Sequence, residues 1–330
     1  MAPRRKMLSP TARYVASRLA TTVIIIFGAM LLLFALGALV PGDPATTLLG
    51  PQATPEYAAQ FIEKMGLHRP LYERLPLFFA NVLRGDLGED VMTGQRVTDM
   101  VFSVLPYTMV LTASSIVLAV LVGAPLGAYA ATRPGSRMDG ILAVSSVAVI
   151  AIPAFVIAVL LLVVFSVWLP FFPVLGVGEQ DDLFDQARRL VLPTLALGIG
   201  WVGMIARLIR ASMIEVLSSD YIRTARAYGL SPRLIVFKYA LKNASIPTVA
   251  VLGLGIGRLL GGAVLVEIIF ARPGLGRLVF DAIATRNFPV LQGAVLVVVV
   301  LFALTNLAVD LSYSALDPRI RRGEPDPGGA

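Results

Sequence analysis

Charged residues divide this chain into long stretches that carry none. The uncharged stretches cover residues 19–42, 100–132, 140–178, 190–206, 243–257 and 287–309. A helix needs about 20 apolar residues to cross a hydrocarbon core of ~30 Å, and five of the stretches are long enough or nearly so. The stretch 243–257 becomes a full span only if the helix continues through Arg258. The pattern therefore predicts six transmembrane helices, at about 18–40, 104–131, 140–165, 190–210, 246–268 and 290–312.

The composition agrees with a membrane protein. Of 330 residues, 57% are hydrophobic and 15% are charged, against about 25% charged in soluble domains. The net charge of +7 would by itself suggest nucleic acid or an anionic surface, but the apolar excess points to lipid and away from a nucleic-acid partner. The chain has no cysteine, and its one histidine, His68, leaves little room for a metal centre.

The distribution of Lys and Arg predicts the orientation. With the N-terminus in the cytoplasm, the internal segments carry 17 basic and 6 acidic residues, and the external segments carry 10 basic and 14 acidic residues. Basic residues concentrate on the cytoplasmic side of membrane proteins. Both termini are therefore expected inside, in the order cytoplasmic N-terminus 1–17, first span 18–40, external segment 41–103, five-helix core 104–314 and cytoplasmic tail 315–330.

Two segments between the spans have helical patterns. The external segment predicts short helices at 55–65 and around 71–84, the second ending at Gly85. The internal segment predicts a helix over 221–228, capped by Asp220 or Ser219 and ended by Gly229. A second amphipathic helix is expected there at 232–243.

The internal helices have two interpretations on the residues alone. They could rest on anionic lipid headgroups, or they could dock on a cytoplasmic partner. In the docking interpretation, small Ala225 lets the partner approach and Tyr221 fills a pocket in it. Both interpretations remain open at this point.

Several residues inside the predicted spans bear on packing and on a polar pathway. Glycines recur every fourth residue, which indicates close helix packing, at Gly123 and Gly127 and at Gly253, Gly257 and Gly261. Pro125 and Pro153 are expected to kink their helices or open a cavity. Arg258 lies in the middle of a span, where it is expected either to pair with another helix or to line a pathway.

Catalytic motifs are absent from the sequence. None of the four lysines follows a glycine, so the chain has no Walker A loop, and a single histidine excludes a His-Glu-x-x-His zinc motif. The sequence therefore predicts that this chain is not an enzyme, with no catalytic residue, metal or cofactor of its own.

A series of short motifs follows in a fixed order along the chain. They are Pro41-Gly42-Asp43-Pro44, Gly66-Leu67, Arg69-Pro70-Leu71, Arg84-Gly85-Asp86-Leu87-Gly88, Pro106 with Thr108, Ile152-Pro153-Ala154-Phe155, the run from Asp220 to Leu230, Ala240-Leu241-Lys242-Asn243-Ala244 with Pro247, Gly262-Ala263 with Glu267, Phe270, Pro273-Gly274-Leu275-Gly276, and Asp310 with Tyr313 and Asp317-Pro318-Arg319. Over about residues 14–322 the chain resembles the membrane permease subunits of bacterial ABC importers for dipeptides and oligopeptides, a family that also serves nickel and glutathione.

The resemblance implies that residues 220–230 form the coupling helix, which sits in a groove of an ATPase subunit. The residues implied in coupling are Asp220, Tyr221, Arg223, Ala225, Arg226, Gly229 and Leu230. The chain departs from the family pattern in lacking the generic glutamate, with Arg223 at its place, and in Tyr228 and Tyr239, where lysine and histidine are common.

The resemblance also implies a fold, partners and a mechanism. The expected fold is an all-α integral membrane protein of the type I ABC importer permease class, in the bacterial plasma membrane. Expected partners are a second homologous permease, two ATPase subunits that bind ATP and Mg²⁺, and an external binding protein. The mechanism would be alternating access, with a pathway lined by Arg258, Gly257, Gly261 and Pro153.

Alternatives to a peptide importer remain. A nickel or glutathione permease belongs to the same family, and peptide is favoured over nickel because soft ligands are scarce. An ion-coupled secondary transporter would need inverted repeats and several buried carboxylates, which the six uneven spans do not provide. An intramembrane enzyme would need catalytic groups at membrane depth, and the sequence provides none.

Overall fold

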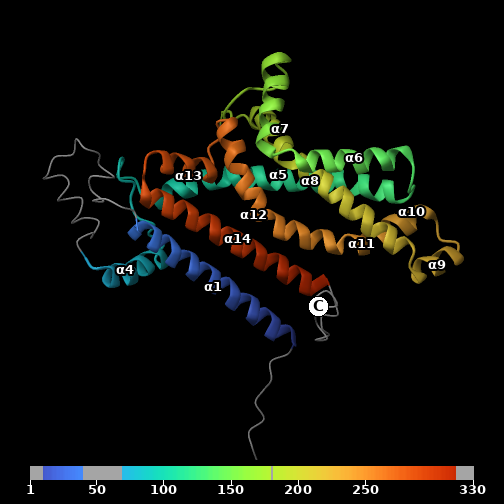
Figure 1. Cartoon of the computed structure of the whole chain (residues 1–330), viewed down its shortest axis with the longest axis horizontal. Helices are drawn as coiled ribbons and strands as arrows, with labels where there is room; N and C mark the ends of the chain where they lie inside the picture. Colours follow the sequence, from blue (N-terminus) through green and yellow to red (C-terminus); the bar gives the residue numbers. More distant parts are fainter. Residues whose placement is uncertain (1–9, 40–68, 180, 317–330) are drawn as a thin grey trace, which may run out of the picture. The chain divides into compact units, whose positions relative to one another are not determined.

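The computed structural model describes residues 10–39, 69–179 and 181–316, and within these ranges the chain is helical and has no β-strand. The predicted helix at 55–65 and His68 lie outside the described residues. The elements are α1 (Pro10–Leu39), α4 (Leu71–Leu83), α5 (Val97–Ala131), α6 (Arg137–Ala151), α7 (Ala154–Leu162), the π-helix η1 (Val163–Trp168), α8 (Leu183–Leu217), α9 (Asp220–Ala227), α10 (Pro232–Leu234), the π-helix η2 (Ile235–Ala240), α11 (Leu241–Ala244), α12 (Ile246–Ile269), α13 (Leu275–Ala284) and α14 (Phe288–Leu316) (Figure 1).

The chain forms two compact units. One unit comprises Met1–Arg13, Met109–Arg272 and Ala308–Ala330, and the other comprises Tyr14–Thr108 and Pro273–Leu307. The first unit contains α6 to α12 and most of α5. It also contains the residues that the sequence assigns to coupling and to the pathway.

Among the described residues, four helices are long and apolar enough to cross a membrane, and two bent pairs raise the number to as many as six. The four lie at Arg13–Gly37, Val97–Ala131, Leu183–Leu217 and Phe288–Leu311, and each overlaps a predicted span. Several of them extend past the predicted bounds. These helices include polar and charged residues at their ends, which the apolar stretches used for the prediction leave out.

The predicted third span, 140–165, is not one straight helix. It is divided into α6 and α7, which lie at 96° to each other with the break at Ile152 and Pro153. Ile152 is extended, with φ −83° and ψ 123°. Proline has no N–H to donate and disfavours the helical conformation in the residue before it, which explains the break at this position. Pro125, by contrast, lies within α5 without interrupting it.

The helix predicted at 232–243 is present but not regular. The π-helix η2 occupies its middle, between α10 and α11. This short helical run precedes the first part of α12 at an angle of 42°. Ser231 accepts a hydrogen bond from the N–H of Leu234 and so caps the start of α10. π-Helical turns occur frequently at functional sites.

Glycines bring the backbones of α5 and α8 into close contact. A Cβ atom at Gly123 would lie 2.7 Å from the carbonyl oxygen of Val202, and one at Gly127 would overlap the carbonyl oxygen of Ala206. The sequence prediction that these two glycines serve helix packing is therefore confirmed. Gly253 of α12 has the same role, since a Cβ there would overlap the side chain of Val309.

Replacing Gly127 with alanine is expected to destabilise the protein by about 1–3 kcal/mol, because the neighbouring atoms are backbone and cannot rotate away. The measurement is the thermal midpoint of the purified protein in detergent. Gly140→Ala in α6 is the matched control, because no atom lies within 4 Å of the added Cβ and alanine favours a helix. Equal midpoints for the two variants would contradict this account of the α5–α8 contact.

An ion pair fixes the start of α6 to α8. Arg210 donates from Nη2 to Oδ2 of Asp139 at 2.7 Å and from Nε to Oδ1, in a two-pronged arrangement. The Asp139 side chain is 7% exposed, and its Oδ2 also accepts from the N–H of Gly135 at 3.0 Å. A bidentate pair of this kind fixes orientation as well as distance. It therefore holds the turn before α6 against the part of α8 that leads into α9.

In the other unit, the segment before α5 is held by Asp90. Its carboxylate accepts from the N–H of Met92, the hydroxyl of Thr93 and the side-chain amide of Asn287. Burial raises the pKa of Asp90, but these hydrogen bonds outweigh burial and hold the pKa below its ordinary value. The turn is thereby tied to the connection between α13 and α14.

Candidate functional site

The short helix α9 is set apart from α8 by a sharp turn. Ser219 is extended at the N-cap position, but its hydroxyl donates to the carbonyl of Val216, so no side chain caps α9. Ser219, one of the two predicted caps, therefore occupies the N-cap position without the expected side-chain hydrogen bond, and the predicted helix, 221–228, differs from the observed one by only one residue at each end. Gly229 has a φ of 73° and ends the helix in the left-handed conformation, as predicted.

One face of α9 is buried against its own chain. Ile222 is fully buried and Ala225 is 8% exposed. They belong to a cluster that we call the junction core, whose buried members are Ala119, Ala128, Ala131, Ile205, Ile209, Met213, Ile222, Ala225, Ile235, Ala240 and Ala244. Leu230 packs against this core from the side. The expectation that Ala225 lets a partner approach is corrected, because its side chain faces inward and packs in the junction core, where α9 contacts η2.

The rest of the surface of α9 is exposed and largely charged. Arg223 and Asp220 form an ion pair at 3.5 Å, and their side chains are 80% and 93% exposed. An exposed pair of this kind contributes little to stability, so both groups remain available to a partner. Arg226 is exposed too, and Tyr221 is 44% exposed. These four side chains form the surface that α9 presents.

Tyr221 also bonds within the chain. Its hydroxyl oxygen accepts a hydrogen bond from Nδ2 of Asn243 in α11 at 2.8 Å. The sequence does not identify Asn243 as a functional residue, since the two residues are separated by 22 positions. The bond forms because η2 and α11 fold back onto α9 through the junction core. Figure 1 shows α9, α10 and α11 gathered near the C-terminal end of α8.

The candidate pathway residues lie on α12 and at the α6–α7 break. Arg258 and Gly261 are exposed, and Leu265, one turn further along, is 46% exposed. No atom lies within 4 Å of a Cβ added at Gly261, so this glycine does not pack within its own chain as Gly253 does. Gly257 is partly exposed, and Pro153 is exposed at the start of α7, a helix that contacts α12.

Arg258 and Glu267, the two charged residues of α12, differ in their exposure to solvent. Glu267 is 1% exposed, whereas Arg258 is exposed and forms no ion pair with any side chain in the described ranges. The positions 258, 261 and 265 fall on one side of a helix. We call this side, Arg258, Gly261 and Leu265, the open face of α12. One of the two sequence interpretations was that Arg258 pairs with another helix, and the described residues contain no ion-pair partner for it.

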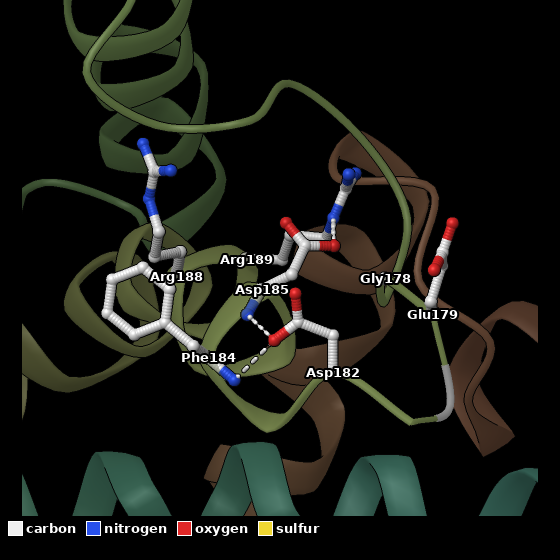
Figure 2. Close-up of a pocket in the computed structure, with 7 residues that line it drawn as sticks. All are labelled: Gly178, Glu179, Asp182, Phe184, Asp185, Arg188 and Arg189. Atoms are coloured by element: carbon white, nitrogen blue, oxygen red, sulfur yellow. Dashed lines mark hydrogen bonds and ion pairs between the residues drawn. The ribbon is translucent and has the colours of Figure 1, made fainter.

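A charged depression of about 500 Å³ lies beside the start of α8 (Figure 2). Asp182 accepts from two backbone N–H groups in the first turn of α8, and Arg189 donates to Asp185 at 2.8 Å. Arg188 donates to the carbonyl of Phe171 at 2.8 Å. These charged groups already form bonds within the chain. Their bonds attach the loop before α8 to the start of that helix. The residues that line the depression are Gly178, Glu179, Asp182, Phe184, Asp185, Arg188 and Arg189.

The fold and the site define a class of protein: a helical membrane protein that carries a short helix, α9, with one buried and one exposed side, between two candidate spans. Two family models cover most of the chain. The model described as "Binding-protein-dependent transport system inner membrane component" matches residues 123–322. The model described as "Binding-prot-dependent transport system membrane comp, N-term" matches residues 11–112.

Curated relatives match over nearly their full length. A probable peptide ABC transporter permease, y4tP of Sinorhizobium fredii, is 39% identical and covers 93% of this chain and 99% of its own. The dipeptide permease DppB of Alkalihalophilus pseudofirmus is 36% identical, and the match covers 93% of this chain and 99% of DppB. The glutathione permease GsiC of Escherichia coli strain K12 is 38% identical, and the match covers 93% of this chain and 98% of GsiC.

A solved structure shows the same fold. A chain of the MetNI methionine ABC transporter, in an inward-facing conformation, superposes with a TM-score of 0.52 at 20% identity, covering 66% of this chain and 95% of that one. The chain therefore belongs to the ABC importer permeases of the peptide and glutathione group, and the family resemblance drawn from its motifs is confirmed. Its relatives are transport subunits and not enzymes.

Proposed function

We propose that this chain is the permease subunit of an ATP-driven peptide importer and that α9 is its docking element for an ATPase subunit. The observation that carries the proposal is the division of α9 into two faces. Ile222 and Ala225 attach the helix to the junction core, while Tyr221, Arg223 and Arg226 stay at the surface. A helix so mounted offers a partner a fixed, cationic and aromatic surface.

The proposed mechanism is alternating access in the bacterial plasma membrane. Two ATPase subunits bind ATP and Mg²⁺, while this chain holds no cofactor. Their closure displaces α9, and this permease rocks against a second, homologous permease to open the pathway toward an external binding protein. The proposed topology has six spans with both termini in the cytoplasm, as the distribution of basic residues predicts.

The open face of α12 is the proposed lining of the pathway. An arginine at membrane depth requires a polar partner or water, and the described part of this chain supplies no ion pair for Arg258. A pathway between two permeases provides water and substrate carboxylates. Short peptides are the proposed substrates. Glutathione is the second candidate, because the glutathione permease GsiC is 38% identical, close to the 36% of a dipeptide permease.

Uptake of labelled substrates by a strain that lacks this gene tests the proposal. We expect the strain to lose uptake of dipeptides or longer peptides and to regain it when the gene is restored. Labelled glutathione, added in parallel, separates the second candidate. Depleting ATP without collapsing the proton gradient should stop uptake. Uptake that instead depends on the gradient and not on ATP would contradict the proposal.

A further inference from the structure

The hydrogen bond between Tyr221 and Asn243 links the docking helix to the helix that carries Arg258. Tyr221 is the second residue of α9, and Asn243 lies in α11, which only Ser245 separates from α12. The Ser245 hydroxyl donates to the carbonyl of Leu241 at 2.6 Å, and the N–H of Val249 donates to the carbonyl of Ser245 at 3.1 Å. The backbone hydrogen bonds thus continue from α11 into α12.

The other attachments of α9 have a different character. Ile222 and Ala225 contribute apolar contacts, which hold the helix down but have no preferred direction. The hydrogen bond from Thr224 to Asp220 and the Arg223–Asp220 pair stay within α9, and the long 3.5 Å bond from Arg226 reaches only Leu217 of α8. Among the described side chains, the Tyr221–Asn243 bond is the directional contact from α9 to α11.

We propose that this hydrogen bond transmits the displacement of α9 to α12, with Asn243 as a positioning residue for transport. The inference rests on the proposed function, since it requires an ATPase that moves α9. Apolar packing alone would allow α9 to slide over the junction core. A hydrogen bond of 2.8 Å depends on both distance and angle, so it fixes the position of α9 along α11.

The test uses the complete complex of both permeases, ATPases and binding protein, reconstituted in liposomes. Tyr221→Phe removes only the hydroxyl, and Asn243→Leu removes only the amide. In each variant the amount of peptide transported per ATP hydrolysed is expected to fall about threefold to tenfold, the range that one net hydrogen bond supports. The double variant should fall no further than either single variant, since both remove one interaction.

Two further variants separate transmission from general disturbance. Tyr239→Phe in η2 is the matched control, because its hydroxyl forms no hydrogen bond with the described chain, and its ratio should equal that of the wild type. Asn243→Asp should restore the ratio, because its carboxylate accepts from the Tyr221 hydroxyl. The ATPase subunits should co-purify in unchanged amount with Asn243→Leu, Asn243→Asp and Tyr239→Phe, because neither Asn243 nor Tyr239 belongs to the surface that α9 presents.

The outcomes distinguish the two levels of the proposal. A wild-type complex without ATP-dependent peptide uptake would contradict the proposed function itself. A wild-type complex that transports peptide, beside a Tyr221→Phe variant with an unchanged ratio, would contradict only the transmission by this bond. An equal fall in peptide transported per ATP hydrolysed in Tyr239→Phe would also contradict transmission by the Tyr221–Asn243 bond.

Discussion

Replacing Ala225 with glutamate is expected to abolish ATP-driven uptake while the permease still inserts into the membrane. Ala225 is 8% exposed within the junction core, where a carboxylate would be placed among apolar side chains. Burying an unpaired charge costs several kcal/mol. With eight residues, α9 is too short to persist alone, so it is expected to detach from the junction core.

Ala227→Glu is the matched control for Ala225→Glu. Ala227 lies on the same helix, two residues further along, and is exposed, so the same charge there stays in water. This variant is expected to keep most of its uptake. Permease in the membrane fraction, bound ATPase and peptide uptake are measured together for both. Normal uptake by Ala225→Glu, or equal loss in both variants, would contradict the inward orientation of Ala225.

Replacing Arg258 with methionine is expected to reduce peptide uptake about tenfold or more, the effect of losing a charge-assisted hydrogen bond. Methionine keeps much of the length of the side chain and removes the charge. An arginine at mid-membrane costs about 2.5–3.5 kcal/mol on insertion scales. Arg258 is exposed on the open face of α12, so we expect that cost to be offset by water and substrate in the pathway.

Arg258→Lys provides the comparison, because it keeps the positive charge and loses the planar, forked geometry of the guanidinium. Uptake by this variant should lie between those of the wild type and Arg258→Met. The measured quantities are the maximal rate and the half-saturating concentration of peptide, with the amount of assembled complex determined in parallel. Wild-type uptake and substrate range in Arg258→Met would exclude a pathway role. A loss only of assembled complex would assign Arg258 to the contact between permeases.

The helix α9 shows which features of the structure can be predicted from the sequence. Its existence and its end at Gly229 were predictable, because a helix-breaking glycine and the spacing of apolar residues are local signals. The sequence does not predict that the side chain of Ala225 faces inward. The signal was present, since Ile222 and Ala225 lie three residues apart on one face, but Tyr221 and Ala225 also share a face. Packing in the junction core, against η2, decides between the two.

The third predicted span makes a similar point. Pro153 indicated a kink, but a proline within a helix produces anything from a slight bend to a complete break. Pro125 lies inside an uninterrupted α5, whereas Pro153 stands at a 96° bend. The residues do not state the angle, because it depends on what each half of the helix packs against.

The sequence by itself determined that this is a helical membrane protein, where most of its spans lie and to which family it belongs. The class of protein and the places of the spans follow from local composition, because transfer of apolar residues into lipid is nearly additive along a chain. The family follows from the order of short motifs along the chain. Only the tertiary structure decided that Asp139 pairs with Arg210, that Tyr221 bonds to Asn243 and that Arg258 lies on an open face. Such side-chain pairs join residues distant in the chain, and they form only where packed helices bring them within hydrogen-bonding distance.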